Sequence, residues 1–449
     1  MMSKRSNGVA ISIEKELSRL KSASPGAIAV ASAVLLAACG SSSPVAASVS
    51  TTAATSTPVS ISLWESHNGG PVGGAMTTLV NKFNASHKSV HVNIVVTKAS
   101  KKLEAAISAG NPPALAEISH YDGTLVKAGA LISWNSFLKS SSVVTKSNML
   151  PVVWTNGEVN GQHYRFQADL KLSEVFYNEA LFKKAGIASA PTTWTQLGND
   201  AKKLKSLGVI PIGWKDSSAH ILPAFLSNGG TMLKGNNSIG NAVDFNNTAG
   251  NTTFSYFRSL YSAKELQFHH GTTLRQDLAA GKIAMIDGTS AGYQKVLEAV
   301  GGKFGVGAFV EPAGSTGKAY NMAQGLGFVL PKGTPTAKQK AAWTFVQWWF
   351  GSAQQAYWAE ITGFAPETKA GMKAIPASFL SGHPGLAASL GAASSPNTYP
   401  RPVSDSYKEV QAALNAEFFN AVTGKETVSA ALSKLESEGD SYMSGASKI

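Results

Sequence analysis

The chain has 449 residues, which is more than a single hydrophobic core usually fills, so two domains or lobes are expected. Hydrophobic residues make up 43% of the chain and charged residues 15%, a balance that excludes both an intrinsically disordered and a membrane-embedded protein. The formal net charge of +12 admits nucleic acid as a partner, but the lysines are scattered over helices without aromatic interleaving or a nucleic-acid motif. Anionic lipid or an anionic solute explains the charge better.

The N-terminus has the features of a secretion signal. Basic residues precede an apolar run over 27–38 that is too short to span a bilayer. The run ends in Leu36-Ala-Ala-Cys39-Gly40, which resembles a lipobox; the alternative is a small buried thiol in an apolar helix, but the Ser-, Thr-, Ala- and Pro-rich stretch that follows favours lipidation of Cys39. We therefore expect a signal peptide over 1–38 and a lipidated flexible tether over 39–58, at the outer face of the cytoplasmic membrane. Because Cys39 is the only cysteine, disulfides are excluded.

The next segment alternates strands and helices. Apolar periodicity predicts strands over 60–64, 90–96 and 114–119 and helices over 75–83 and 102–109. Glu65 and His67 lie in the glycine-rich loop that follows the first strand. Ligands lie beyond the carboxyl ends of strands in α/β sheets, so this loop is a candidate pocket wall.

The middle of the chain predicts the order strand, helix, helix, strand. Residues 172–177 and 209–213 form strand-length runs, and residues 181–185 have apolar side chains at helical spacing. Thr193 is a candidate N-cap for a helix over 194–207.

This middle segment resembles bacterial extracellular solute-binding proteins of family 1, which include the maltose-, sugar- and glycerol-3-phosphate-binding components of ABC importers. The similarity lies in Phe176-Tyr177-Asn178, Lys183-Lys184-Ala185-Gly186 and Pro191-Thr192-Thr193-Trp194, and it extends to residues 277–288, 325–331 and 361–366.

The resemblance implies an α/β fold of the periplasmic-binding-protein type II, with two lobes joined by a hinge that the chain crosses three times. Lobe one is expected over 59–168 and 289–330, and lobe two over 169–288 and 331–449. A solute would be captured in the cleft between the lobes by a monomer that works with membrane permease subunits. The resemblance implies no chemistry on the solute and no cofactor.

The resemblance also indicates ligand contacts near the first crossing between lobes. Tyr121 and Asp122 follow the third strand, where related glycerol-3-phosphate-binding proteins carry an aromatic-acid pair; alternatively, Asp122 caps a helix on the surface. Lys171, near Ser173, either points into the cleft or is solvated at a strand edge. Trp214 ends a strand where relatives often have a tryptophan against the ligand, and the alternative is a core tryptophan.

Four later residues complete the candidate ligand-binding set. Ser290 is a candidate hydroxyl donor, and Gly325 either presents its N–H to the ligand or relieves crowding between strands. Phe364 stands where many relatives have a tyrosine that lines the pocket. Arg401 falls where glycerol-3-phosphate-binding relatives have a phosphate-contacting arginine; the alternative is a surface arginine.

The cations in this set favour an anionic solute. A phosphate held by Arg401, Lys171, Ser290 and the N–H of Gly325 would form charge-assisted hydrogen bonds of about 1.5–3 kcal/mol each. A neutral sugar would leave those cations without a partner. We therefore expect glycerol-3-phosphate or a related phosphodiester, with a neutral mono- or oligosaccharide as the alternative.

A secreted esterase is the main competing class of function. Gly288-Thr-Ser290-Ala-Gly292 matches a nucleophile elbow, with candidate acids at Glu311, Glu360 or Glu367 and a histidine at His383 downstream. Such short patterns recur by chance in a chain with 43 glycines. The helix-strand alternation also argues against an adhesin or a structural lipoprotein.

No metal site is expected from the sequence. His87 and His91 are four residues apart, but they lie across a predicted helix-strand junction and not on one face of a helix. No phosphate-binding P-loop, dinucleotide fingerprint or EF-hand spacing is present in the sequence.

Overall fold

The computed structural model of the chain describes residues 57–119, 123–215, 217–234, 242–269, 271–402 and 406–445. These residues all belong to one unit, residues 56–449. The expected signal peptide and Cys39 lie outside the described residues, as do Tyr121 and Asp122. Within the described ranges, no helix is both long enough and apolar enough to cross a bilayer.

The first sheet is built mainly from the N-terminal third of the chain. In β1 the side chains of Ile61 and Leu63 are buried on one face, and the same alternation buries Glu65 at the end of the strand. β1 runs parallel to both of its neighbours, whereas β14 is antiparallel to its partners. The sheet order is β2 (Val90–Val96), β1 (Val59–Glu65), β3 (Leu115–Ile118), β14 (Gly327–Pro331) and β4 (Leu131–Ile132), with β7 (Arg165–Gln167) also paired to β14.

Aromatic side chains dominate the core on this sheet. Trp349 packs edge-on against Phe328 with ring centroids 5.4 Å apart, and Phe83 packs against Phe345 at 5.1 Å. Pro71 stands in the first turn of α1, so the helix begins inside the glycine-rich segment that was expected to remain a loop. The helices of this lobe are α1 (Gly70–Ser86), α2 (Ala99–Ser108), α3 (Gly123–Lys127), α4 (Asn135–Leu138), α5 (Pro151–Thr155), α12 (Thr336–Trp349), α13 (Ser352–Thr362) and α14 (Lys369–Ala374).

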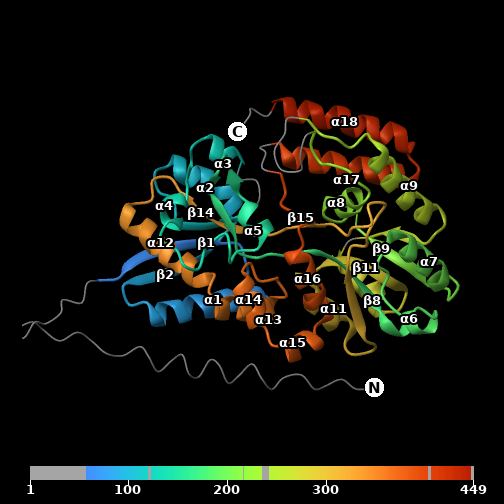
Figure 1. Cartoon of the computed structure of the whole chain (residues 1–449), viewed down its shortest axis with the longest axis horizontal. Coiled ribbons are helices and arrows are strands. Elements are labelled where there is room, and N and C mark those ends of the chain that lie inside the picture. The colour runs from blue at the N-terminus through green and yellow to red at the C-terminus, as the bar shows by residue number, and fades with distance from the viewer. Residues whose placement is uncertain are drawn as a thin grey trace, which may run out of the picture. The chain divides into compact units, whose positions relative to one another are not determined.

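The second sheet has the order β10 (Leu266–Phe268), β9 (Ile210–Trp214), β11 (Ile283–Thr289), β8 (Ser173–Asn178) and β12 (Val306–Val310). Thr193 caps the helix that follows it, as predicted, because its Oγ1 accepts a hydrogen bond from Gln196 N at 3.1 Å. Gly288 is needed for close packing, since a Cβ there would lie 2.3 Å from the ring of Phe176. The helices of this lobe are α6 (Glu179–Lys184), α7 (Trp194–Lys205), α8 (Ser218–Ser227), α9 (Thr248–Ser262), α10 (Gly271–Ala279), η1 (Ser290–Gly292), α11 (Tyr293–Val300), α17 (Tyr407–Thr423) and α18 (Val428–Gly445). Figure 1 labels β1, β2 and β14 of the first sheet and β8, β9 and β11 of the second.

Short elements connect the two lobes. Lys171 N donates to Gln324 O, and Gln324 N donates to Lys171 O, both at 3.0 Å, so the first two crossing segments are paired. The third crossing segment is β15, which runs parallel to β13. The connecting and peripheral elements are β5 (Glu158–Val159), β6 (Gln162–His163), β13 (Asn321–Met322), β15 (Thr398–Tyr399), α15 (Ala377–Ser381) and α16 (Pro384–Ser394).

The sheets divide the chain differently from the expected lobe ranges. The chain passes from β7 to β8 near residue 169, as expected, but β12 pairs with β8 and so keeps residues 289–310 in the second lobe. The chain returns to the first sheet only with β14, and α12 and α13 then pack in the first core. α16 then contacts β12 and β8 of the second sheet, and α17 and α18 pack in the second core. Residues 289–310 stay in the second lobe because Val296 and Val300 of α11 pack on the second sheet, so the chain continues into β12 of the same sheet.

Candidate ligand-binding site

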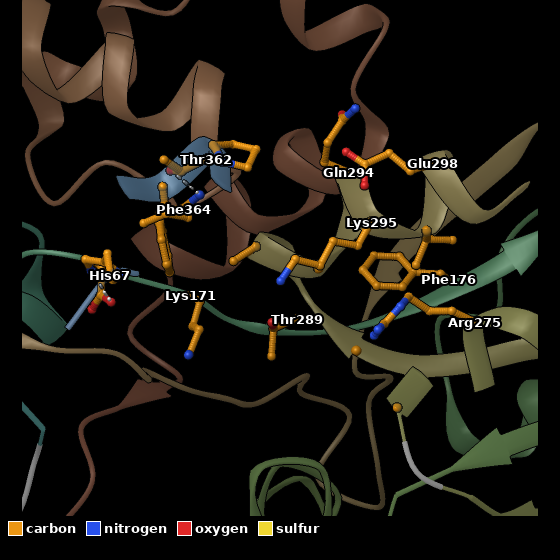
Figure 2. A pocket seen from close by; sticks show the side chains of 18 of the residues that line it. His67, Lys171, Phe176, Arg275, Thr289, Gln294, Lys295, Glu298, Thr362 and Phe364 are labelled. Carbon is orange, nitrogen blue, oxygen red and sulfur yellow. Dashed lines mark hydrogen bonds and ion pairs between the residues drawn. The ribbon is translucent and has the colours of Figure 1, made fainter. Parts of the chain in front are cut away.

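A cavity of about 480 Å³ lies between the two lobes. Figure 2 shows side chains from distant parts of the sequence around this one space. Its first-lobe and crossing wall includes Ser66, His67, Pro71, Val72, Asp169, Lys171, Leu326, Thr362 and Phe364. Its second-lobe wall includes Phe176, Lys215, Arg275, Ile286, Asp287, Thr289, Gln294, Lys295 and Glu298.

Strand ends position most of the first wall. His67 follows the carboxyl end of β1, and Lys171 lies in the segment that crosses from β7 to β8. Phe364 follows the end of α13 and is stacked on Trp358, with ring centroids 5.7 Å apart and planes within 6°. This stack presents an apolar surface to the cavity beside the polar side chains of the crossing segment.

Two helices and a strand end position the second wall. Thr289 is the last residue of β11, and Lys295 lies on α11, which begins four residues after that strand. Arg275 lies on α10, and Lys215 follows the end of β9. Because β9 and β11 are parallel neighbours, their carboxyl ends and the segments that follow them meet at the same edge of the sheet.

Besides His67, the cavity wall carries four lysine and arginine side chains: Lys171, Lys215, Arg275 and Lys295. Lys215 Nζ lies 3.5 Å from the Asp287 carbonyl oxygen, and an Arg275 guanidinium nitrogen lies 3.4 Å from Thr272 Oγ1. Among the described residues, none of the four forms an ion pair with a carboxylate. Their charges are therefore available to an anion in the cavity.

Two acidic residues of the wall, Asp169 and Asp287, are already engaged. Asp169 Oδ1 accepts a hydrogen bond from Leu326 N, and its Oδ2 lies 3.7 Å from His67 Nε2. Asp287 Oδ2 lies 3.3 Å from His220 Nε2, and the other ring nitrogen of His220 lies 3.2 Å from Glu311 Oε1. Burial lowers the pKa of His220 and raises the pKa of Glu311, so burial favours the uncharged form of both groups.

His67 joins a second buried acidic cluster. Its Nε2 lies 3.2 Å from Glu117 Oε2, and its backbone N–H donates to Glu65 Oε2 at 2.5 Å. Burial lowers the pKa of His67, but the nearby carboxylates of Glu117, Asp169 and Glu65 outweigh that effect and raise the pKa to about 9. Burial, reinforced by the charge of Glu117, raises the pKa of Asp169 above its ordinary value. The cluster thus places three carboxyl groups around the His67 side chain and backbone behind the first wall.

The structure brings three of the predicted site residues to the cavity: His67, Lys171 and Phe364. Lys171 thus occupies the cleft and not a solvated strand edge. Glu65 lies behind His67, buried, where it accepts the His67 N–H. That these residues contact the solute is a prediction.

Trp214 and Ser173 are buried in the protein interior and do not line the cavity. Trp214 is fully buried at the end of β9, where its ring contacts Trp194 and Phe257, so the core alternative describes it. Ser173 is buried too: its Oγ donates to Ala219 O at 2.6 Å and accepts from Gln324 Nε2 at 3.1 Å. Ser173 begins β8 and Trp214 ends β9, and both side chains are buried in the interior of the protein.

Gly325, Ser290 and Arg401 also lie off the cavity wall. Gly325 has φ +131°, and a Cβ there would lie 2.0 Å from Asp169 O, so its role is to allow the two crossing segments to approach. Ser290 is buried at the start of η1. Arg401 donates to Gln324 Oε1 at 3.2 Å and is not among the described residues that line the cavity.

Sequence reasoning missed the cations of the second wall, Lys215, Arg275 and Lys295. A signal for Lys215 was available, since it directly follows a predicted strand. Arg275 and Lys295 lie on helices, where lysine and arginine usually mark a solvated face. Only the packing of α10 and α11 on the second sheet shows that this part of their surface faces the cavity.

The arrangement needed for an esterase does not form among the described residues. Ser290 Oγ is buried and has no hydrogen-bond partner there, so no histidine is positioned as its general base. His383 Nδ1 lies 2.8 Å from Phe379 O, and its ring is stacked on that of Phe379.

Comparisons with known proteins agree with this architecture. A family model described as "Bacterial extracellular solute-binding protein" matches residues 78–377, which is more than half of the chain. The chain has no significant match among curated protein sequences.

Several solved structures share the fold. The sugar-binding protein MalE from Xanthomonas citri superposes with a TM-score of 0.77 at 16% identity, covering 86% of this chain and 98% of that one. The cyclic alpha-maltosyl-1,6-maltose binding protein from Arthrobacter globiformis gives 0.75 at 19%, covering 86% and 100%. UgpB from Mycobacterium tuberculosis, solved with glycerophosphocholine, gives 0.73 at 17%, covering 85% and 98%. The fold is thus the two-lobed α/β fold of type II periplasmic binding proteins, and the chain belongs to the bacterial extracellular solute-binding protein family.

Proposed function

We propose that this protein captures a small solute between its lobes and delivers it to an ABC importer, and that the solute is a polyol or sugar bearing an anionic group such as a phosphodiester. The observation that carries the proposal is the set of four cavity cations, Lys171, Lys215, Arg275 and Lys295. Cations that line a cavity without carboxylate partners can form charge-assisted hydrogen bonds with a bound anion.

The positions of these cations also couple binding to closure. Lys171 lies in a crossing segment, whereas Arg275 and Lys295 lie on helices of the second lobe, as Figure 2 shows. An anion that contacts both groups interacts more strongly with the closed form, in which they are close together. Solute therefore shifts the population towards closure, and the closed form is the one that the permease would recognise.

The remaining wall suits the uncharged part of such a solute. Thr289, Gln294 and Glu298 offer hydrogen-bonding groups for hydroxyls, and the rings of Phe176 and Phe364 offer apolar surface for carbon-bound hydrogens. A similar chemistry is present in glycerophosphocholine, the phosphodiester with which the structurally similar UgpB was solved.

A binding measurement with charge-matched solutes tests the proposal. Glycerol-3-phosphate, glycerophosphocholine and maltose would be titrated into the wild-type protein and into the Lys295→Met and Arg275→Met variants by calorimetry. Each lost charge-assisted hydrogen bond costs about 1.5–3 kcal/mol, so the dissociation constant of an anionic solute should rise about 10- to 150-fold per variant. Lys282→Met is the matched control, because Lys282 is 70% exposed, pairs with Asp277 and does not line the cavity.

A neutral oligosaccharide is the second candidate. It is favoured by the aromatic and hydroxyl-binding part of the wall and by the sugar-binding proteins among the structures with this fold. If maltose raises the melting temperature, glycerol phosphates do not, and Lys295→Met leaves the maltose affinity unchanged, the neutral-sugar function replaces the anionic one.

We further propose that the protein is tethered to the membrane through Cys39. This residue lies outside the described residues, and the proposal is supported by the lipobox-like Leu36–Gly40 segment and the polar stretch that follows it. A tether keeps the binding protein close to the permease and so raises its effective concentration there.

A further inference from the structure

Three side chains of metal-ligand type converge behind the first wall of the cavity. Glu65 and Glu117 lie in adjacent parallel strands, β1 and β3, and His67 follows Glu65 by two residues. One candidate ligand atom from each of the three lies within 4.8 Å of the others. Two strand ends and one loop thus hold an imidazole and two carboxylates in a common position.

One carboxyl group of this cluster has no hydrogen-bond donor within the described part of the chain. Glu117 is fully buried, yet neither of its carboxylate oxygens accepts a hydrogen bond among the described residues; its contact is with His67 Nε2, 3.2 Å from Oε2. The Oδ2 of buried Asp169 also approaches His67 Nε2, at 3.7 Å. A buried carboxyl group without a hydrogen-bond donor is costly, and a cation bound at the three converging ligand atoms would satisfy it.

We propose that Glu65, His67 and Glu117 form a binding site for a divalent transition-metal cation of the Zn²⁺ class. An imidazole nitrogen combined with carboxylate oxygens suits Zn²⁺ better than Ca²⁺ or Mg²⁺, which prefer oxygen ligands alone. Asp169, whose other oxygen accepts the Leu326 N–H, would orient His67 or approach the cation from the crossing segment.

The site adjoins the solute cavity. His67 lines the cavity, while Glu65 and Glu117 lie buried behind it. Three protein ligands would leave at least one coordination position for another oxygen donor. A water molecule or an oxygen atom of the solute would complete the coordination. The sequence predicted no metal ligands, because Glu65 and His67 show no spacing signal without Glu117, which is 50 residues further along the chain.

Zinc titration without solute tests this inference separately from the transport function. The untagged protein would be freed of metal with a chelator, dialysed, and titrated with ZnCl₂ in a calorimeter. We expect saturable binding of one Zn²⁺, weakened at least about 10- to 100-fold in Glu117→Gln and in His67→Ala, since loss of a direct ligand should cost no less than loss of an outer partner. His163→Gln is the matched control: it removes another buried histidine, 3.9 Å from Glu158, and should leave the affinity unchanged.

Glu65→Gln separates a metal site from a plain ion-pair cluster. Glutamine keeps an oxygen that accepts the His67 N–H, so the metal-free variant should fold, which its melting curve checks, but its affinity for Zn²⁺ should fall. The inference is overturned if the wild-type protein shows no saturable Zn²⁺ binding, or if Glu65→Gln, Glu117→Gln and His67→Ala all bind with the wild-type affinity. Mg²⁺ or Ca²⁺ binding that persists in His67→Ala would equally overturn the assignment to a transition metal.

Discussion

Glu174 provides a quantitative test of the electrostatics in the second lobe. It lies in β8, the strand between β11 and β12, opposite Gly288 on one side and Val310 on the other, and it is fully buried. The hydroxyl of Ser389 donates a hydrogen bond to its Oε1, but its Oε2 has no hydrogen-bond partner among the described residues. Burial therefore raises the pKa of this carboxyl well above its ordinary value of 4.5.

The sign of the effect on stability follows from proton uptake. Above pH 4.5 an unfolded chain has lost the Glu174 proton, whereas the folded chain retains it until its own, raised pKa is reached. The folded state then binds more protons, so the free energy of unfolding falls as pH rises through this window, by up to about 1.4 kcal/mol per pH unit. Glu174→Gln keeps an acceptor for Ser389 and removes the titration. The difference in the free energy of unfolding between Glu174→Gln and wild type should therefore increase with pH, by up to about 1.4 kcal/mol per pH unit. The amide itself adds a difference that does not change with pH.

Urea unfolding at pH 5, 6, 7 and 8 measures that slope. Ser389→Ala removes a hydrogen bond that lowers the Glu174 pKa but leaves the carboxyl in place, so the fall in stability with rising pH should persist and extend to higher pH. Glu104→Gln, at an exposed position on α2, is the matched control and should also leave the slope unchanged. If Glu174→Gln and wild type show parallel stability curves between pH 5 and 8, then Glu174 is ionised in the folded protein and the argument from burial fails.

Four further outcomes are expected. Trp214→Ala should lower the free energy of unfolding by about 3–5 kcal/mol in urea titrations, because the ring is fully buried against Trp194 and Phe257. A change in solute affinity without loss of stability would contradict this core role. Gly325→Ala should abolish or severely reduce the yield of folded protein, since φ is +131° and the new Cβ would lie 2.0 Å from Asp169 O, whereas Gly391→Ala, with open space at its Cβ, should fold normally in the same expression and melting assay. Cys39→Ser should move the protein from the detergent phase to the aqueous phase in a partitioning experiment, and equal partitioning of both forms would refute the lipid anchor. Ester-substrate assays should show no hydrolysis that depends on Ser290, so equal rates are expected for wild type and Ser290→Ala, and a serine-dependent rate would favour the esterase.

Local patterns in the sequence were sufficient to predict most of the elements and the fold class. The expected strand over 60–64 lies within β1, and the strand over 209–213 largely coincides with β9. Runs of alternating or continuous apolar residues identify such strands because a sheet covered by helices buries apolar side chains on its faces. Thr193 caps α7 because capping involves only residues close in sequence. The motifs around residues 176–194 led to the correct family and to the two-lobed fold.

The tertiary structure alone decided which side chains face the cavity. Trp214 and Lys215 are neighbours at the end of one strand, yet the first is in the core and the second lines the cavity, because sheet register and helix packing set the direction of each side chain. Arg275 and Lys295 reach the same space from two helices, and Glu117 reaches His67 from another strand. Such long-range positions depend on how strands 50 or more residues apart pair, which no local pattern encodes. The sequence therefore determined the elements and the class of protein, and the packing of the lobes determined the charge of the site.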